Sequence, residues 1–179
     1  MKYKVIGLMS GTSLDGLDLA YCEFSHESNR WAYYIRCAET IAYSGSWRER
    51  LANVESGSAL DLVAADVEYG HLIGQLTHEF IGRHHLQPDF IASHGHTVFH
   101  QPAKKITCQI GRGAAIATET GLAVVCDFRS TDVALGGQGA PLVPAGDRLL
   151  FGNFDFCLNL GGFANISYEQ DSQRIAFDT

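Results

Sequence analysis

A turn rich in glycine and hydroxyl side chains, residues 11–16, lies near the start of the chain between two apolar runs. These runs, residues 5–10 and 17–22, have the composition of β-strands. Glycine lets a backbone approach an anion closely, and the exposed N–H groups of such a turn are donors for phosphate oxygens. The accompanying hydroxyl donors are those of Ser10, Thr12 and Ser13. A plain surface turn explains the same residues, because Gly, Ser and Asp populate turns for steric reasons alone.

The segment after the turn separates it from two common phosphate-binding loops. Walker and Rossmann loops run from a strand into a helix. Residues 17–24 instead carry Asp18, Tyr21 and Phe24 in a pattern that favours a strand. A glycine turn within a hairpin is typical of the actin, hexokinase and Hsp70 class of ATP-binding folds.

Further motifs follow in a fixed order along the chain. They are the segments 7–16, 93–97, 109–111, 127–129, 132–144, 158–165 and 177–179. In this order they closely resemble the anhydro-N-acetylmuramic acid kinases, the sugar kinases of bacterial cell-wall (peptidoglycan) recycling. The resemblance runs from end to end, and the run Gly-Gly-Gln-Gly-Ala-Pro-Leu-Val-Pro at 136–144 is far more specific than a lone glycine motif.

The resemblance implies an α/β fold with a ribonuclease H-like lobe of the actin/hexokinase/Hsp70 type, in which helices flank a mixed sheet. Residues 1–150 are then the N-terminal lobe, with the phosphate hairpin and the sugar-binding loop. Residues 151–179 are the opening strands of a second, similar lobe. Family members are about twice as long as this chain, so we expect a truncated, inactive fragment whose last strands expose apolar edges and self-associate or are partly disordered.

The resemblance also implies a reaction, in which ATP and water convert 1,6-anhydro-N-acetylmuramic acid to N-acetylmuramic acid 6-phosphate. Water attacks the anomeric carbon while the released O6 takes the γ-phosphoryl group. Asp178 matches the family's catalytic aspartate, which activates the water. The Gly-Pro pair that follows this aspartate in the family motif is missing here.

The nucleotide site is expected at two facing glycine hairpins. The residues that match the ATP-binding segment are Gly11, Thr12, Ser13, Leu14, Asp15, Gly16, Leu17 and Asp18, and Gly161 and Gly162 resemble the opposing phosphate clamp. Asp15 is the candidate to reach Mg²⁺ or its waters, since Mg²⁺ prefers hard oxygen ligands. An Asx turn that stabilises the hairpin is an equally open interpretation of Asp15.

The amino sugar is expected at a second set of residues. These are His94, Gly95, His96, Arg129, Asp132, Gly137 and Gln138. Arg129 suits the lactyl carboxylate, because a guanidinium binds carboxylates bidentately, with a structural salt bridge to Asp132 as the alternative. The chain departs from the family pattern at Ser130 and Thr131, where many members have arginines, and at His96, where many have glutamine. Glutamine and histidine both donate and accept hydrogen bonds, so a role at the sugar survives.

The histidines His94, His96 and His100 also raise the question of a metal-dependent hydrolase of the same fold. The spacing of His96 and His100 places two ligands on one face only in a helix, and this segment follows a strand. No cysteine or carboxylate lies nearby to complete a zinc site. A further alternative is an Hsp70-like ATPase, which needs no counterpart of the loop 132–144.

Composition narrows the classes of partner. With 13 Lys and Arg against 20 Asp and Glu, the net charge is −7, which argues against a nucleic-acid partner. No apolar run is long enough to cross a bilayer, and residues 1–4 lead directly into a strand rather than a signal peptide. The cysteines form no Cys-x-x-Cys pair, and four are expected as reduced core thiols: Cys22, Cys108, Cys126 and Cys157. These features predict a cytoplasmic protein, and the family implies a homodimer at full length.

The elements that must position these residues alternate between strands and helices. Strands are predicted near 4–10, 17–24, 31–43, 90–92, 106–110, 123–127, 154–160, 164–168 and 175–177. Helices are predicted from the capping box Ser58/Asp61 to about Arg83, after 110 up to Thr120, and over 141–150. In the long helix we expect two apolar stripes, one at Leu60, Val63, Ala64 and Val67 and one at Ile73, Leu76 and Phe80.

Overall fold

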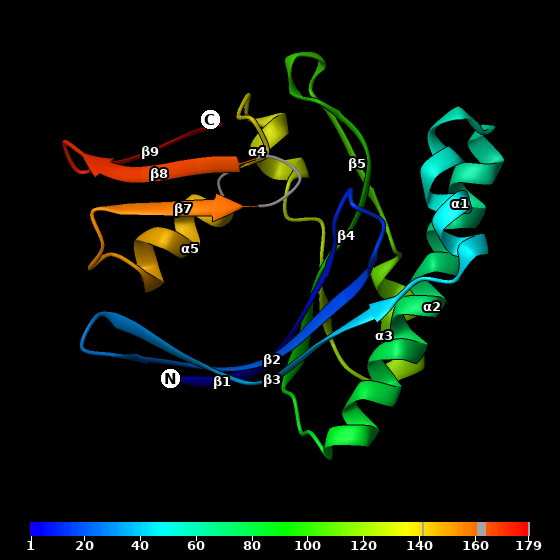
Figure 1. Cartoon of the computed structure of the whole chain (residues 1–179), viewed down its shortest axis with the longest axis horizontal. Coiled ribbons are helices and arrows are strands. Elements are labelled where there is room, and N and C mark those ends of the chain that lie inside the picture. The colour runs from blue at the N-terminus through cyan, green and yellow to red at the C-terminus, as the bar shows by residue number, and fades with distance from the viewer. Residues whose placement is uncertain (141, 161–163, 179) are drawn as a thin grey trace.

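The computed structural model describes residues 1–140, 142–160 and 164–178, with the backbone alone for Leu142. Two sheets and their covering helices make up the described chain (Figure 1). The larger sheet has the order β3-β2-β1-β4-β5, with β6 also paired to β4, and the smaller has the order β7-β8-β9.

The larger sheet is mixed, as predicted. Its strands are β1 (Lys2–Ser10), β2 (Gly16–Glu27), β3 (Arg30–Ala42), β4 (Phe90–Gln101), β5 (Ile106–Ile110) and β6 (Val124–Val125). The first three strands form an antiparallel meander, and β4 runs parallel to β1 and β6 but antiparallel to β5. The parallel pair β1 and β4 therefore brings two carboxyl ends to one edge, where α/β folds gather ligands.

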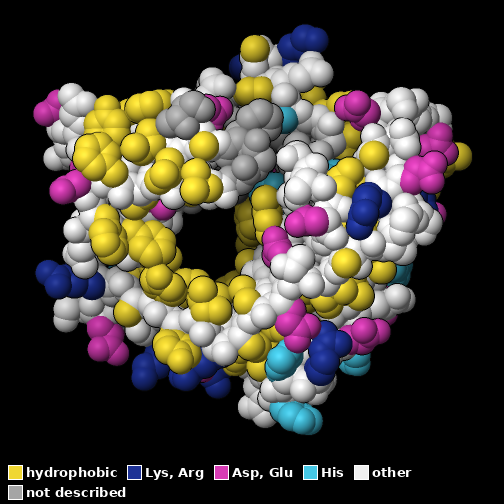
Figure 2. Space-filling view, viewed as in Figure 1, with side chains coloured by type: hydrophobic (Ala, Val, Ile, Leu, Met, Phe, Trp, Pro, Cys, Tyr) yellow, Lys and Arg dark blue, Asp and Glu magenta, His cyan; other side chains and the backbone are white. Residues whose placement is uncertain are grey.

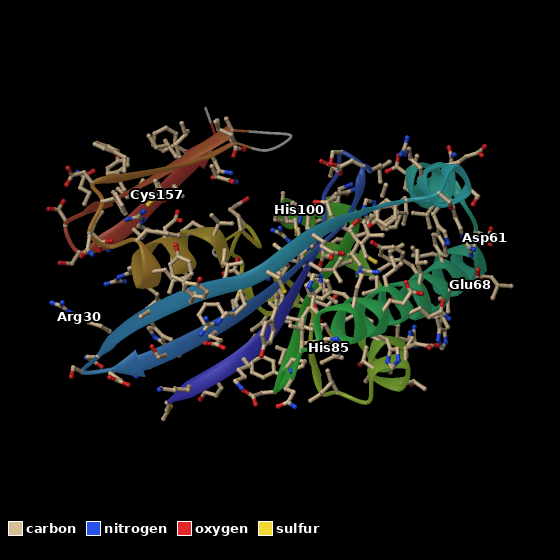
Figure 3. All side chains as sticks on the ribbon, turned by 60° about the horizontal axis from the view of Figure 1, so that its bottom comes forward. Arg30, Asp61, Glu68, His85, His100 and Cys157 are labelled. Atoms are coloured by element: carbon tan, nitrogen blue, oxygen red, sulfur yellow. The ribbon has the colours of Figure 1, made fainter. Side chains whose placement is uncertain are left out.

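The helices of the described chain are α1 (Gly45–Asn53), α2 (Ala59–His84), α3 (Gly113–Thr120), α4 (Ser130–Ala134) and α5 (Leu142–Leu150), with short 3-10 turns η1 (Val54–Ser56) and η2 (Pro102–Lys104). The predicted capping box opens α2: the Ser58 hydroxyl accepts from the Asp61 N–H (3.1 Å), and the Asp61 carboxylate accepts from the Ser58 N–H (2.9 Å). Figure 3 shows Asp61 near the start of α2 and His85 at its end. Sequence analysis missed α1.

The buried face of α2 confirms one predicted stripe and corrects the other. Ile73 and Phe80 are fully buried in the core with Tyr69. Leu60 is 76% exposed and Val63 is 51% exposed, so the first stripe is wrong. The reason is geometric: Leu60 lies nine residues before Tyr69, which is two and a half turns, and therefore points to the opposite side of the helix.

Two glycines of α2 let α3 pack closely against it. A Cβ at Gly70 would lie 2.8 Å from the Arg112 carbonyl oxygen, and one at Gly74 would lie 2.6 Å from Glu119 Cβ. Both distances are shorter than a real contact allows. The pair α2 and α3 therefore covers the core side of the larger sheet as one layer (Figure 1).

A bulge in β4 shapes the edge where ligands are expected. Leu8 pairs with Ser93 and Ser10 with His96, so β4 advances by three residues while β1 advances by two. Gly95 accommodates the bulge at φ +71°, and a Cβ there would lie 2.5 Å from the Ile110 carbonyl oxygen. The bulge lets the strand continue to Gln101, beyond the end that we predicted near residue 95.

The smaller sheet consists of β7 (Phe156–Leu160), β8 (Ala164–Gln170) and β9 (Gln173–Asp178), which confirms the three predicted strands. Helix α5, also predicted, lies between this sheet and the long β2–β3 hairpin (Figure 1). It contacts the sheet through Asp147, which accepts a hydrogen bond from the Ser167 hydroxyl. Phe151, the residue that follows α5, meets the hairpin, with its ring centroid 5.6 Å from that of Tyr33.

Candidate functional site

The glycine turn joins β1 to β2 as a hairpin, as the pattern of residues 17–24 predicted. The Leu14 N–H donates to the Gly11 carbonyl (3.4 Å), and Leu14 sits at φ +55°, a conformation that costs energy for a residue with a Cβ. Thr12 and Ser13 are exposed. The turn therefore offers the Thr12 hydroxyl and backbone N–H groups to solvent, as a phosphate cradle requires.

Asp15 stabilises this hairpin from within. Its Oδ1 accepts from the Ser13 hydroxyl (2.6 Å) and from the Gly16 N–H (3.1 Å). The Ser13 hydrogen bond lowers the pKa of the Asp15 carboxyl, so the group is charged at neutral pH. Both bonds engage Oδ1 only, and Oδ2 has no hydrogen bond within the described residues. The N–H that Asp15 binds is one residue on and not two, so the Asx turn considered from the sequence does not form.

The last residues of the predicted nucleotide segment, 16–18, are on the whole less accessible to a ligand than Thr12 and Ser13. Leu17 is buried in the core, so its side chain faces away from any ligand. Asp18 is exposed and accepts from the Thr40 hydroxyl (2.5 Å). A Cβ at Gly16 would lie 2.5 Å from the Ile41 carbonyl oxygen, so only glycine fits where the turn enters β2. Gly161 and Gly162 lie outside the described residues.

The predicted sugar residues of β4 and α4 form one hydrogen-bonded cluster. Arg129 Nε donates to His94 Nε2 (2.9 Å), and Arg129 Nη1 donates to the Gly139 carbonyl. Asp132 Oδ2 accepts from the Gly139 N–H (2.7 Å), and the Asp132 carbonyl accepts from the Gly137 N–H (2.8 Å). The loop from Arg129 to Gly139 is thereby folded back onto β4.

Arg129 is half-buried and pairs with no carboxylate within residues 1–140, 142–160 and 164–178. The salt bridge to Asp132 that we considered does not form, because the Gly139 backbone lies between the two side chains and binds both. Burial lowers the pKa of Arg129, which nevertheless stays a cation at neutral pH. An unneutralised guanidinium held on two sides is an anion-binding group.

The neutral form of His94 is what the Arg129 contact requires. Its Nδ1 lies 2.9 Å from the Gly95 carbonyl, which can only accept, so Nδ1 carries the hydrogen and Nε2 accepts from Arg129. Burial lowers the pKa of His94 and favours this neutral ring. Both ring nitrogens of His94 are therefore engaged within the protein.

His96 and two residues that sequence analysis missed form a separate buried chain. The His96 Nδ1 lies 3.1 Å from the Ser10 hydroxyl, which accepts from the Tyr43 hydroxyl (2.9 Å), and Tyr43 in turn lies 2.6 Å from the Tyr69 hydroxyl. The signal for Tyr69 was its position four residues before Ile73 on one helix face. Nothing in the local sequence marked Tyr43.

The remaining predicted site residues lie apart from these clusters. Gln138 is exposed, and Asp178 is exposed at the end of β9, paired with Asn165. Within the described residues, the Asp178 side chain forms no hydrogen bond or ion pair with the first sheet. The structure thus unites His94, Arg129 and Asp132 and leaves Asp178 on the smaller sheet.

The histidines do not converge on a metal. In the part of the chain that the structure describes, no three His, Cys, Asp or Glu side chains are arranged to hold a metal ion. His100 Nδ1 instead lies 3.2 Å from the Thr107 hydroxyl (His100 is labelled in Figure 3). All five cysteines are free thiols, but Cys126 is exposed and not a core residue as expected, because β6 ends at Val125.

Two surface grooves lie away from the predicted residues. One of about 290 Å³ runs along β1–β3 and is lined by Tyr3, Phe24 and Tyr33 among others. The other, of about 510 Å³, lies beside α5 and is lined by residues that include Arg148 and Arg174. The molecule is also hollowed between the two sheets, with hydrophobic side chains around the opening (Figure 2). No described helix has the length and apolar composition to span a membrane.

Known proteins similar to this chain agree on one family. A family model described as anhydro-N-acetylmuramic acid kinase matches residues 3–179. A kinase of that name from Synechococcus elongatus is 41% identical over 175 residues, covering 92% of this chain and 46% of the relative. One from Paramagnetospirillum magneticum is 40% identical (97% and 50% covered), and one from Pseudomonas fluorescens is 41% identical (96% and 48% covered).

The chain spans about half the length of the curated relatives that it matches. The mixed sheet flanked by helices agrees with the ribonuclease H-like, actin/hexokinase-type fold expected of this family. Sequence and fold together show that this chain belongs to the anhydro-N-acetylmuramic acid kinase family.

Proposed function

We propose that the protein containing this chain is an ATP-dependent kinase of cell-wall recycling in the cytoplasm, and a homodimer at full length. It converts 1,6-anhydro-N-acetylmuramic acid, ATP and water to N-acetylmuramic acid 6-phosphate and ADP. The observation that carries the proposal is the family match over residues 3–179, with the glycine hairpin after β1 and the Arg129 cluster against His94 of the neighbouring strand β4.

Residues 1–150 supply the nucleotide hairpin and the sugar loop, and residues 151–179 open the second lobe. The segment Gly11–Asp18 binds the phosphates of ATP through backbone N–H groups and hydroxyls. The free Oδ2 of Asp15 suits Mg²⁺ or its waters. When bound, that ion neutralises charge on the phosphates.

The sugar lies against the loop that Arg129 organises. Arg129 binds the lactyl carboxylate with the N–H groups that His94 and Gly139 leave unused. Gly95, His96, Asp132, Gly137 and Gln138 complete the sugar site. These contacts fix the sugar so that its anomeric carbon faces the attacking water.

Asp178 acts as the general base. Its carboxylate takes a proton from the water that attacks the anomeric carbon, while the released O6 attacks the γ-phosphorus of ATP. Asp178 is exposed on the smaller sheet, so the base and the sugar loop belong to different sheets. Closure of the two sheets on the sugar then brings them together.

The test is sugar-dependent ADP formation by the full-length protein with MgATP, with the product identified by mass spectrometry. The proposal predicts ADP and the 6-phosphate in equal amounts, and no ADP without the sugar. ATP consumption without a phosphorylated sugar would instead favour the Hsp70-like ATPase. Sugar-ring opening that needs a metal but no ATP would favour the hydrolase.

A further inference from the structure

A chain of four buried polar side chains runs beneath the glycine turn. Tyr69 of α2 is 0% exposed, Tyr43 after β3 is 6%, Ser10 at the end of β1 is 3%, and His96 of β4 is 5%. Their polar atoms are linked at 2.6, 2.9 and 3.1 Å in that order. Four elements thus meet at the residue that immediately precedes Gly11.

The direction of each hydrogen bond follows from counting hydrogens. Tyr43 has one hydroxyl hydrogen and gives it to Ser10, so Tyr43 must accept from Tyr69. The Ser10 hydrogen then needs an acceptor. Its partner at 3.1 Å is Nδ1 of His96, and a ring nitrogen is a stronger acceptor than the phenol oxygen of Tyr69, which also lies near Ser10.

The opposite arrangement is unfavourable. If His96 Nδ1 carried the hydrogen, Ser10 would accept twice and its own buried O–H would lose the ring nitrogen as its acceptor. Burial also lowers the pKa of His96 and raises the pKa of Tyr43 and Tyr69, so the ring is neutral and both phenols keep their hydrogens. His96 therefore carries its hydrogen on Nε2.

We propose that Tyr43 is a positioning residue that acts through Ser10 to hold His96 as the Nε2–H tautomer, a hydrogen-bond donor to a substrate oxygen. The Nε2 atom has no hydrogen-bond partner in the described part of the chain. The bulge at Gly95 places His96 opposite Ser10, next to the turn. Only the identity of the oxygen, a sugar oxygen, rests on the proposed function.

The chain also distinguishes the two histidines of β4. His94 has its hydrogen on Nδ1 and uses Nε2 as an acceptor for Arg129, whereas His96 has the reverse tautomer. One strand thus holds two histidines in opposite tautomers two residues apart: His94 accepts from Arg129, and His96 keeps a donor that no described residue uses. A histidine in fast exchange between tautomers would present neither reliably.

Two-bond ¹H–¹⁵N spectra of histidine-labelled full-length protein test this without any sugar. His96 is assigned from the signal lost in His96→Gln. We expect Nδ1 of His96 in the position of an unprotonated ring nitrogen and Nε2 in that of a protonated one. Tyr43→Phe should move His96 toward the Nδ1–H tautomer, because Ser10 is then free to accept.

Two further variants make the result specific. Tyr69→Phe should keep the Nε2–H tautomer, since Tyr43 still donates to Ser10, and the exposed control Tyr34→Phe should change nothing. An Nδ1–H tautomer in the unmodified protein, or no change in Tyr43→Phe, would overturn the proposal. If Tyr43→Phe fails to fold, the unmodified protein and Tyr69→Phe still decide.

Steady-state kinetics test the donor role separately. His96→Ala should raise KM for the sugar about threefold to tenfold, and His96→Gln, which also has a side-chain N–H donor, should restore it. His96→Gln no better than His96→Ala would refute the donor role. A protein that phosphorylates no sugar would refute the proposed function but leave the spectroscopic result standing.

Discussion

The two sheets differ in which of their faces is covered. The core face of the larger sheet lies beneath α2 and α3, and the polar cluster at its edge is held by hydrogen bonds on several sides. In the smaller sheet α5 covers the polar face, where Ser167 and Arg174 meet Asp147. The opposite face carries Phe156, Leu158, Leu160 and Phe177, all exposed.

The register explains why these exposed side chains share a face. Leu158 pairs with Ile166, and Ile166 pairs with Phe177, so the three side chains point the same way. Figure 2 shows hydrophobic side chains gathered over this part of the molecule. Such a face is an association surface when nothing covers it, and our expectation that the isolated chain self-associates stays a prediction.

The two sheets also differ in how far the proposed site is preformed. Arg129 and His94 already hold each other in place, whereas Asp178 has no side-chain partner among the described residues. Changes on the larger sheet should therefore affect stability and binding of the sugar. Changes at Asp178 should affect the chemical step alone.

The largest expected effect is that of Asp178→Asn. Loss of a general base should lower kcat about 10²–10⁴-fold, while the unfolding midpoint stays unchanged because Asp178 is exposed. Initial rates of the full-length protein with MgATP and the sugar measure this. The control is Asp171→Asn in the turn after β8, which should keep full activity; equal loss in both variants would show a structural effect instead.

The next largest expected effect is the loss of stability when a side chain in the core beneath the larger sheet is truncated. Ile73→Ala should lower the free energy of unfolding by about 2–5 kcal/mol, because Ile73 is fully buried. Val63→Ala on the exposed side of α2 should change it by no more than about 0.5 kcal/mol. Urea unfolding of both variants decides, and a costly Val63→Ala would mean that another surface covers that side.

Arg129→Ala should weaken sugar binding. A hydrogen bond to a charged group contributes about 1.5–3 kcal/mol, so KM for the sugar should rise roughly 10- to 150-fold, with KM for ATP unchanged. Arg30→Ala at the tip of the β2–β3 hairpin (Figure 3) is the matched control. A rise in KM for ATP instead would assign Arg129 to the nucleotide.

The smallest effect is a pH dependence of stability. Burial lowers the pKa of His94 in the folded state, so the unfolded chain binds more protons, and stability falls as the pH drops below the ordinary histidine range near about 6.5. Urea unfolding from pH 7.5 to 5 should show a shallower fall for His94→Gln than for the unmodified protein. The exposed His78→Gln should match the unmodified protein, and a fall identical in all three would contradict this assignment.

Local sequence patterns correctly predicted the features that depend on neighbouring residues alone. The capping box at Ser58 and the strands of both sheets follow from hydrogen-bonding residues and apolar runs within a few positions. The prediction that the first apolar stripe of α2 is buried was wrong, because apolar residues spaced along one side of a helix do not reveal which side meets the sheet. That choice depends on the α3 contact at Gly70 and Gly74, far along the chain.

The sequence named residues that the structure brings together but not the contacts between them, and their role at a sugar stays a prediction. The motifs named His94, Arg129 and Asp132, and the structure joins all three through Gly139. The salt bridge between Arg129 and Asp132, considered as the alternative role of Arg129, does not form, because the backbone amide and carbonyl of Gly139 bind the two side chains instead. Tyr43 reaches Ser10 only through tertiary packing, since they lie 33 residues apart, and no spacing rule marks such a pair.

The most direct test of the account follows the oxygen of the attacking water. The full-length protein is incubated with MgATP and 1,6-anhydro-N-acetylmuramic acid in ¹⁸O-water, and the product is quenched at once and read by mass spectrometry. We predict one ¹⁸O at the anomeric position of N-acetylmuramic acid 6-phosphate and none in its phosphate. Label in released phosphate, with an unlabelled or unphosphorylated sugar, would show that water attacks ATP and would contradict the account.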